Sequence, residues 1–458
     1  MDPRWLLALA WLAGFTLIDS SIVSLALPDI AREFDRSVGE LAWVSTAYLL
    51  ALAATLLAAG RLSDRFGQRP VLAAGAIAFL LTTAACGLAP TFEVLIAARL
   101  LQGVAGGVLY TVSLAITVTA FPPERRATAI GIYFTSGALG AVIGPVIGGM
   151  LTDLGGWRLV FLAQLPLPLL VAIGAVAMLP AATRRTGPFD ISGIAAASLF
   201  LVATTFAMLQ LPVPGGGLVA LLVGMVAIGS LVAFVVIERG ATDPAVRLGI
   251  FSNSRFVVAT SAGAGAWFAI MSSVVFPALY LQLGRGFSAG DSGLILLAAP
   301  MVSLVGFPFA GRIVAALGVP RAMLVGLLLM VAGGAAMVTW GRETPVSWIV
   351  AVSLVTGGGI ALTLVSSAAE ALAQFAPAEA GTGSALFNSL RQLGAAMGVA
   401  VPAAAFEFAA RGARTADASL EGSTAAFVIR TIVLAIPLLL VAAQHRRRMA
   451  SARATADA

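Results

Sequence analysis

Long apolar runs, each about 20 residues in length, recur along the whole chain and are separated by short polar turns. An α-helix of that length spans the roughly 30 Å hydrocarbon core of a bilayer. Hydrophobic residues make up 60% of the sequence and charged residues only 10%, whereas soluble domains carry about 25% charged residues. A bilayer offers the backbone no hydrogen-bond partners, so a spanning segment must satisfy its own N–H and C=O groups. The sequence therefore predicts an all-α polytopic membrane protein.

These runs predict fourteen transmembrane helices. Their expected ranges are 5–27, 41–59, 71–89, 93–118, 128–150, 159–179, 190–211, 217–237, 256–282, 292–310, 321–340, 347–371, 382–406 and 424–443. The first run leads directly into further spans, so we interpret it as a retained helix and not as a signal peptide. With the N-terminus inside, about 17 arginines fall in cytoplasmic segments, including Arg184 and Arg185, and about 7 fall outside. The positive-inside rule therefore predicts that both termini are cytoplasmic.

The ionisable residues limit how a proton could cross this protein. All 27 basic residues are arginine, and the only histidine is His445, at the end of the last span. Because arginine keeps its proton at working pH, a transported proton must be carried by a carboxylate. The arginine bias indicates a high-GC bacterial genome, so we expect a multi-pass protein of the bacterial cytoplasmic membrane. The single cysteine, Cys86, excludes a disulfide within the monomer.

A charged turn with the sequence GRLSDRFGQR lies between two apolar runs, at residues 60–69. Its pattern, G-x-L-x-D-R-x-G-x-R, resembles the loop between helices two and three of the major facilitator superfamily of secondary transporters. Two interpretations are open. The arginines only fix orientation in the membrane, or Asp64 and its neighbours form a charge network against a helix end that forms and breaks during transport. The residues of this candidate conformational-switch loop are Gly60, Asp64, Arg65, Gly67 and Arg69.

Two motifs repeat at nearly equal spacing and divide the chain into halves. The tripeptide GRL at 60–62 recurs as GRI at 311–313, an offset of 251 residues, and LGAVIG at 139–144 recurs as LGAAMG at 393–398, an offset of 254. The second copy of the charged turn has Ala315 in the place of Asp64.

The repeat predicts two six-helix bundles with two inserted linker helices between them. The expected domains are an N-terminal bundle at 1–185, the linker helices within 186–245, a C-terminal bundle at 246–445 and a basic cytoplasmic tail at 446–458. The linker helices carry no charged residue between Ile191 and Ile237, so we expect them to face lipid. Six plus two plus six helices resembles the fourteen-helix drug:proton antiporter branch of the superfamily.

Charged residues within the spans are the candidates for proton coupling. The segment 95–107 resembles the family's fourth-helix motif, in which an arginine, here Arg99, precedes a Gln-Gly pair. A guanidinium in the membrane needs a partner, and Asp19 lies at a similar depth in a segment that resembles the first helix of the branch. The pair is either a static structural ion pair, or Asp19 is a proton site or a cation contact tuned by Arg99. Glu370 is either a solvated residue at the inner end of its span or a second proton carrier, whereas Glu407 and Arg430 are expected at the membrane interface.

The sequence GAVIGPVIGG at 140–149 resembles a motif associated with antiporters of the superfamily. Glycines at every fourth position allow close helix packing, which alone is a sufficient explanation, and the proline bends the helix. The resemblance favours export over uptake. The motif residues are Gly140, Gly144, Pro145, Gly148 and Gly149.

Several polar and aromatic residues are candidates to line a substrate cavity. They are Asp19, Tyr48, Arg99, Gln102, Tyr110, Tyr133, Phe134, Trp267, Phe268, Phe276, Asn388 and Arg391. Each of the aromatic residues is also consistent with a simple packing role. No P-loop, metal-ligand cluster or catalytic nucleophile is present in the sequence, so we expect neither an enzyme nor a cofactor, metal or ATP requirement. The basic tail fits anionic lipid headgroups better than nucleic acid.

The resemblance implies a proton-coupled antiporter that exports lipophilic, cationic drugs by alternating access, with the proton gradient as its energy source. Such a protein would give multidrug efflux and antibiotic resistance, and we expect it to function as a monomer. Three alternatives stay open: export of an endogenous metabolite, lipid, peptide or self-made antibiotic; uptake by symport; and a membrane sensor that does not transport.

Overall fold

The computed structural model describes residues 3–15, 18–36, 38–179, 190–211, 215–410 and 415–456, and these ranges contain helices and turns but no strand. Thirteen helices in this part of the chain are long and apolar enough to cross a membrane. The expectation of an all-α polytopic protein is thereby confirmed. Arg184 and Arg185 lie outside the described residues, as do the side chains of Pro145 and Ser21.

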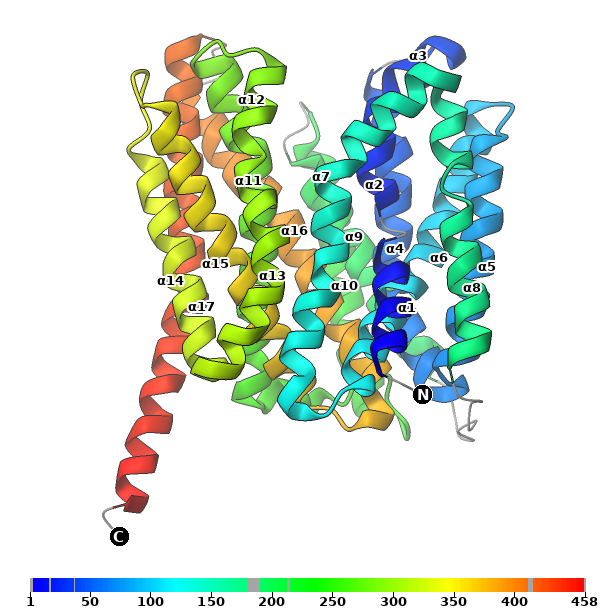
Figure 1. Cartoon of the computed structure of the whole chain (residues 1–458), viewed down its shortest axis with the longest axis vertical. Helices are drawn as coiled ribbons and strands as arrows, with labels where there is room; N and C mark the ends of the chain where they lie inside the picture. The colour runs from blue at the N-terminus through cyan, green and yellow to red at the C-terminus, as the bar shows by residue number, and fades with distance from the viewer. Residues whose placement is uncertain are drawn as a thin grey trace. The chain divides into compact units, whose positions relative to one another are not determined.

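The helices follow one another along the chain with short connections (Figure 1). Those before the linker helices are α1 (Pro3–Phe15), α2 (Asp19–Ile22), η2 (Val23–Ala26), α3 (Leu27–Phe34), α4 (Val38–Phe66), α5 (Gln68–Gly87), α6 (Phe92–Ala120), α7 (Pro123–Leu162) and α8 (Pro166–Met178). The linker helices are α9 (Ile191–Gln210) and α10 (Gly217–Gly240). The remaining elements are η3 (Leu248–Ser252), α11 (Ser254–Leu279), η4 (Tyr280–Gly284), α12 (Ala289–Leu296), α13 (Ala298–Leu317), α14 (Val319–Val338), α15 (Val346–Leu372), η5 (Pro377–Glu379), α16 (Ala380–Ala410) and α17 (Ala416–Ala456).

The first predicted span, 5–27, is not one continuous helix. It is divided into α1, α2 and the 3₁₀ turn η2, and the helical path continues into α3. Pro28 lies in the first turn of α3 and has no N–H to donate to the preceding turn, which accounts for the tighter 3₁₀ geometry of η2. The other thirteen predicted spans each have a counterpart among the long apolar helices.

Glycines with positive φ separate several spans. Gly156 (φ 73°) and its neighbour Gly155 break α7, which divides the fifth predicted span from the sixth. Gly67 joins α4 to α5 with φ 88° and ψ 157°, and Gly318 joins α13 to α14 with φ 80° and ψ 150°. Because residues with a side chain avoid this backbone region, both copies of the repeated turn need their glycine. The sequence repeat is therefore also a repeat of backbone structure.

The helices gather into two compact units. Unit 1 contains Met1–Ala203, Val226–Leu248 and Phe375–Ser389, and unit 2 contains Thr204–Met225, Gly249–Gln374 and Leu390–Ala458. The first turns of α16 therefore belong to unit 1 and the rest of that helix to unit 2. The predicted domain boundaries at 185, 245 and 445 stay predictions.

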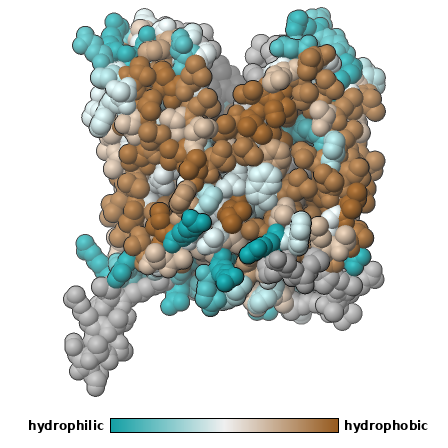
Figure 2. Space-filling model, in the orientation of Figure 1, coloured by the Kyte–Doolittle hydropathy of each residue, from teal (hydrophilic) through white to brown (hydrophobic). Residues whose placement is uncertain are grey.

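Apolar side chains cover most of each unit's face in Figure 2. On α10, for example, Leu221 and Ile228 are 62% and 66% exposed, as lipid-facing residues should be. Figure 1 shows that α17 continues without interruption into the basic segment that begins at Arg446.

Candidate functional site

A buried ion pair lies inside unit 1. Asp19, at the start of α2, and Arg99, on α6, are both fully buried, and the Nη1 atom of Arg99 donates to a carboxylate oxygen of Asp19. Two ions removed from water must compensate each other, because an unpaired charge in such a place is strongly destabilising. The structure thus brings together two residues that are 80 positions apart and that the sequence pattern singled out as candidates.

Amides complete the surroundings of the Asp19 carboxylate. Gln102 Nε2 donates to Asp19 Oδ1 at 3.1 Å, and Gln164 Nε2 approaches the same oxygen at 3.4 Å. Gln102 also accepts from Arg99 Nη1 at 2.6 Å. Gln164 was not among the predicted residues. Its only signal in the sequence is an amide beside the start of α8, a position that by itself does not distinguish a core residue from a helix-end residue.

Arg99 has further contacts that do not involve Asp19. Its Nε donates to the carbonyl oxygen of Val44 at 2.8 Å, and its guanidinium carbon lies 4.5 Å from the ring centroid of Tyr48. A Cβ atom at Gly103 would collide with the carbonyl oxygen of Tyr48, and one at Gly106 would lie 2.8 Å from its hydroxyl oxygen. The glycines that follow the Arg-Leu-Leu-Gln sequence therefore allow α6 to approach α4 and place Tyr48 against the guanidinium.

The glycine motif of α7 packs against the segment that carries Asp19. A Cβ at Gly140 would lie 3.3 Å from Cβ of Ile18, and one at Gly148 would lie 3.1 Å from Cγ1 of Ile22. Ile18 and Ile22 precede and follow Asp19 in the chain, so the two glycines contact the segment on both sides of the carboxylate-bearing residue. Gly144 is buried and Gly149 half-buried on the same helix. The motif therefore sets the distance between α7 and the carboxylate's backbone, whatever further role it has.

The charged turn at 60–69 meets the beginning of α16, within unit 1. The Asp64 carboxylate accepts from the backbone N–H groups of Gly381 and Thr382, both at 2.8 Å, and from the Thr382 hydroxyl at 2.6 Å. A carboxylate at this place satisfies N–H groups that have no partner within the helix and complements its dipole. Gly60 is required for the approach, because a Cβ there would lie 2.6 Å from Cβ of Ala385.

Arginines of the turn contact different elements. Arg61 forms a 3.2 Å ion pair with Asp243, which follows α10, and the Arg65 guanidinium carbon lies 5.6 Å from the Phe66 ring centroid. Arg69 is half-buried in the first turn of α5. The turn thus connects α4 to the chain after the linker helices as well as to α16.

Unit 2 holds two buried arginines on different helices. The Arg391 guanidinium carbon lies 4.9 Å from the ring centroid of Trp267. Arg430 is 1% exposed and donates to the hydroxyls of Ser272 at 3.1 Å and Ser273 at 3.2 Å. Arg430 is therefore buried within unit 2, and its expected place at the membrane interface stays a prediction. Gly334 faces its guanidinium, and this missing side chain leaves the space that buries it.

The other predicted site residues are dispersed. Glu370 is half-buried near the end of α15, and Asn388 is buried on α16. Tyr133 and Phe134 form a tilted ring pair with centroids 5.6 Å apart, and Tyr110 is half-buried on α6.

Two predicted cavity residues of α11 have packing contacts. Phe268 meets Gly398 of α16 through its backbone. Phe276 belongs to a hydrophobic cluster and lies 6.5 Å from Phe406, centroid to centroid. Within the described ranges, no group of three or more histidine, cysteine or acidic residues has an arrangement that could hold a metal ion.

Comparison with known proteins gives consistent matches. The sequence profile described as "Major Facilitator Superfamily" matches residues 9–399. The "Tetracenomycin C resistance and export protein" of Streptomyces glaucescens is 32% identical over 402 residues, covering 86% of this chain and 74% of that protein. The "Puromycin resistance protein" of Streptomyces alboniger is 31% identical over 463 residues, covering 96% and 91%. The "Multidrug resistance protein Stp" of Mycobacterium tuberculosis (strain CDC 1551 / Oshkosh) is 31% identical, covering 84% and 72%.

Solved structures support the fold. The human organic anion transporter MFSD10 (TETRAN) superposes with a TM-score of 0.70 at 17% identity, covering 96% of this chain and all of that chain. A proton:xylose symporter, XylE, gives 0.67 at 14% identity, covering 94% of each chain. With the thirteen apolar helices, the profile match and the relatives above 30% identity, these findings show that the chain is a multi-pass membrane protein that belongs to the Major Facilitator Superfamily of transporters.

Proposed function

We propose that this protein is a proton-coupled exporter of lipophilic, cationic compounds in the bacterial cytoplasmic membrane, with both termini in the cytoplasm. The observation that carries the proposal is the buried Asp19 carboxylate. It is held by Arg99 and two amides, against the helix whose glycine motif resembles that of antiporters. The names of three relatives, which refer to resistance or export, support the direction of transport.

In this proposal, the proton and the substrate compete for Asp19. Ionised Asp19 is paired with Arg99, as in the structure. Protonation removes the carboxylate's charge and weakens that pair, while Arg99 keeps its contacts with the Val44 carbonyl and the Tyr48 ring. The Gln102 and Gln164 amides can hold either form of the carboxyl group. A cationic substrate entering from the cytoplasm stabilises the ionised form and displaces the proton, so the two fluxes become opposed.

Asp64 provides the proposed link between this exchange and alternating access. Its three hydrogen bonds hold the first turn of α16 within unit 1, whereas the rest of α16 belongs to unit 2. Breaking these bonds would free the helix start when the units move. The contact therefore stabilises one state of the cycle and not the other.

A second candidate substrate is an antibiotic or other metabolite made by the same cell. The names of two relatives, the tetracenomycin C export protein and the "Probable actinorhodin transporter" of Streptomyces coelicolor, favour it. Glu370 is the alternative proton carrier, because a permanent Asp19–Arg99 pair would keep Asp19 ionised throughout the cycle.

The test uses inside-out vesicles with an imposed proton gradient and a fluorescent lipophilic cation. We expect gradient-driven dye uptake with the wild type, its loss in Asp19→Asn, and unchanged uptake in Glu407→Gln, a matched change at an exposed carboxylate on α16. Glu370→Gln is measured beside them.

The outcomes of this assay distinguish the proton carrier, the direction of transport and the substrate class. If Asp19→Asn retains full gradient-driven uptake and Glu370→Gln loses it, Glu370 is the carrier. Should dye leave the vesicles in the direction of the proton flux, the protein is a symporter. Transport of a neutral or anionic antibiotic in place of the cation would support the second substrate class.

A further inference from the structure

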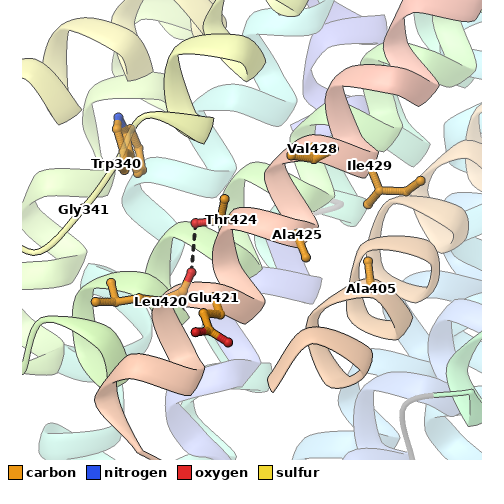
Figure 3. Close-up of a pocket in the computed structure, with 9 residues that line it drawn as sticks. All are labelled: Trp340, Gly341, Ala405, Leu420, Glu421, Thr424, Ala425, Val428 and Ile429. Carbon is orange, nitrogen blue, oxygen red and sulfur yellow. Dashed lines mark hydrogen bonds between the residues drawn. The ribbon is translucent and has the colours of Figure 1, made fainter. Parts of the chain in front are cut away.

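A groove in unit 2 is lined by residues that are far from Asp19 in the sequence and that are mostly apolar. It has a volume of about 650 Å³ and is lined by Trp340, Gly341, Ala405, Leu420, Glu421, Thr424, Ala425, Val428 and Ile429 (Figure 3). Sites for drug-sized molecules have volumes of roughly 300–1,000 Å³, so the groove is large enough for one. It lies near the start of α17, the end opposite to the basic segment of that helix.

The walls of the groove are apolar. In Figure 3, Ala425, Val428 and Ile429 lie along α17, and Ala405 lies on the neighbouring α16. Val428 is 40% exposed, so the groove is open at the side of the helix that a bilayer would cover. A lipophilic body can enter from the membrane without first crossing water.

One charged group lines this groove, the carboxylate of Glu421. Across the ranges that the structure describes, no hydrogen bond or ion pair engages it. The neighbouring Thr424 donates its hydroxyl hydrogen to the Leu420 carbonyl at 3.0 Å, which leaves the hydroxyl oxygen free to accept. A carboxylate and an accepting hydroxyl at the end of an apolar groove are complementary to a cation with a hydrophobic body.

We propose that this groove binds a lipophilic cation from the membrane, with the cationic centre at Glu421 and the apolar body against Ala405, Ala425 and Val428. The proposal deepens the proposed function and rests on it, because the occupant is the same class of compound. With the termini inside, the groove lies toward the outer face, where an exported compound leaves. A phospholipid tail or a second copy of the chain would need no unpaired carboxylate at this position.

The experiment reads occupancy directly by thiol protection. Cys86 is the only cysteine and is buried, so Ala425→Cys introduces a single accessible thiol into the groove. Purified protein in phosphatidylcholine nanodiscs is labelled with a maleimide in the presence of tetraphenylphosphonium or of tetraphenylborate. These two ions have the same shape and opposite charge. The wild type, with Cys86 alone, measures background labelling.

We expect tetraphenylphosphonium to slow the labelling of Ala425→Cys and tetraphenylborate to leave it unchanged. Adding Glu421→Gln should weaken the apparent affinity of the cation roughly fivefold, the upper range for an ion pair in contact with water. Adding Asp19→Asn should leave protection unchanged.

Equal protection by both ions, no protection by the cation, or full protection in Glu421→Gln would each overturn the groove proposal. The outcome is separable from that of the vesicle assay. Protection of the thiol without transport in vesicles would contradict the proposed function and support cation binding in the groove. Transport without protection would support the proposed function and contradict cation binding in the groove.

Discussion

The two units share a set of glycine contacts and differ in the polar groups that these contacts surround. In unit 1, Gly103 of α6 lies against the carbonyl of Tyr48 on α4, and in unit 2 Gly357 of α15 lies against the carbonyl of Ala299 on α13. These pairs are related by offsets of 254 and 251 residues (357 minus 103, 299 minus 48), the spacings of the sequence repeat. In both units, therefore, a glycine at the equivalent position allows the equivalent pair of helices to approach closely.

The glycine motif of α7 also has a counterpart. Gly140 and Gly148 face Ile18 and Ile22 in unit 1, while Gly394 and Gly398 of α16 face the carbonyls of Ala264 and Phe268 on α11 in unit 2. A packing motif that occurs in both units cannot by itself determine chemistry. Its function in unit 1 depends on the carboxylate beside it.

At the polar centre the units diverge. Counting from Gly103 and Gly357, the positions of Arg99 and Gln102 are occupied in unit 2 by Ser353 and Thr356, which are buried. Small hydroxyls therefore stand in place of the arginine and the amide. The scaffold is common to both units, whereas among the described residues the positions of Arg99 and Gln102 carry no charged or amide side chain in unit 2.

The largest effect should come from breaking the ion pair on its cationic side. Arg99→Met leaves Asp19 buried without its guanidinium and, in the part of the chain that the structure describes, with two amides as its remaining side-chain donors. We expect a loss of about 3–5 kcal/mol in the free energy of unfolding, the usual cost of an uncompensated buried charge. Thermal unfolding in detergent can be followed through Cys86, whose buried thiol reacts with a dye only when the protein opens.

Arg430→Met is the matched control in unit 2. In the described part of the chain, Arg430 bonds to two serine hydroxyls and to no carboxylate, so its removal strands no opposite charge. We expect a neutral or stabilising change. Equal destabilisation by the two variants would mean that both arginines contribute through side-chain packing. Charge pairing would then not explain the difference between the units.

A second pair of variants examines the shared scaffold. Gly148→Ala and Gly398→Ala each place a methyl group against a backbone carbonyl, of Ile22 and Phe268 respectively. Because overpacking of this kind costs about 1–3 kcal/mol, we expect similar falls in unfolding temperature for both. Transport should fall more in Gly148→Ala, since the displaced segment carries Asp19. A loss of transport that is equal in both would indicate that general packing, not the position of the carboxylate, limits the rate.

The charged turn provides a smaller effect. Asp64→Ala removes three hydrogen bonds from the start of α16, and loss of such a cap costs about 0.5–2 kcal/mol. We expect a slightly lower unfolding temperature together with a roughly tenfold lower transport rate, because about 1.4 kcal/mol of bias between two states is a factor of ten. Ala315→Asn, at the equivalent exposed position of α13, should change neither. Normal transport by Asp64→Ala would reduce the turn to a determinant of orientation.

Sequence patterns predicted the fold well, because lipid leaves the backbone only one arrangement for each apolar run. They also found Asp19, Arg99 and Gln102, since charges in apolar runs must find partners. They did not find Gln164, because an amide at a helix boundary has no periodic signal. They did not indicate the burial of Arg430, because that burial depends on Gly334, which is 96 residues away (430 minus 334).

The smallest effect concerns an ion pair at the end of α3 in unit 1. Glu33 accepts from Arg158 Nη1 at 2.6 Å and from the Trp157 indole at 2.7 Å, and the Arg158 hydrogen bond, with that of Trp157, lowers the pKa of the Glu33 carboxyl despite partial burial. A lowered folded-state pKa stabilises the protein above the usual glutamate pKa of about 4.3, and this stabilisation disappears as the pH falls. Since Glu33 is 42% exposed, the gain should stay below about 1 kcal/mol. Glu33→Gln should therefore lower the unfolding temperature slightly at pH 7 and by less at pH 3. In unit 2, Asp417 pairs with Arg342 at 2.6 Å but is 77% exposed, so Asp417→Asn should have less effect at either pH. If Asp417→Asn has the larger effect, the Trp157 indole contact does not add to the stability of the Glu33–Arg158 pair. Among the described residues, the Asp417–Arg342 pair has no such indole contact.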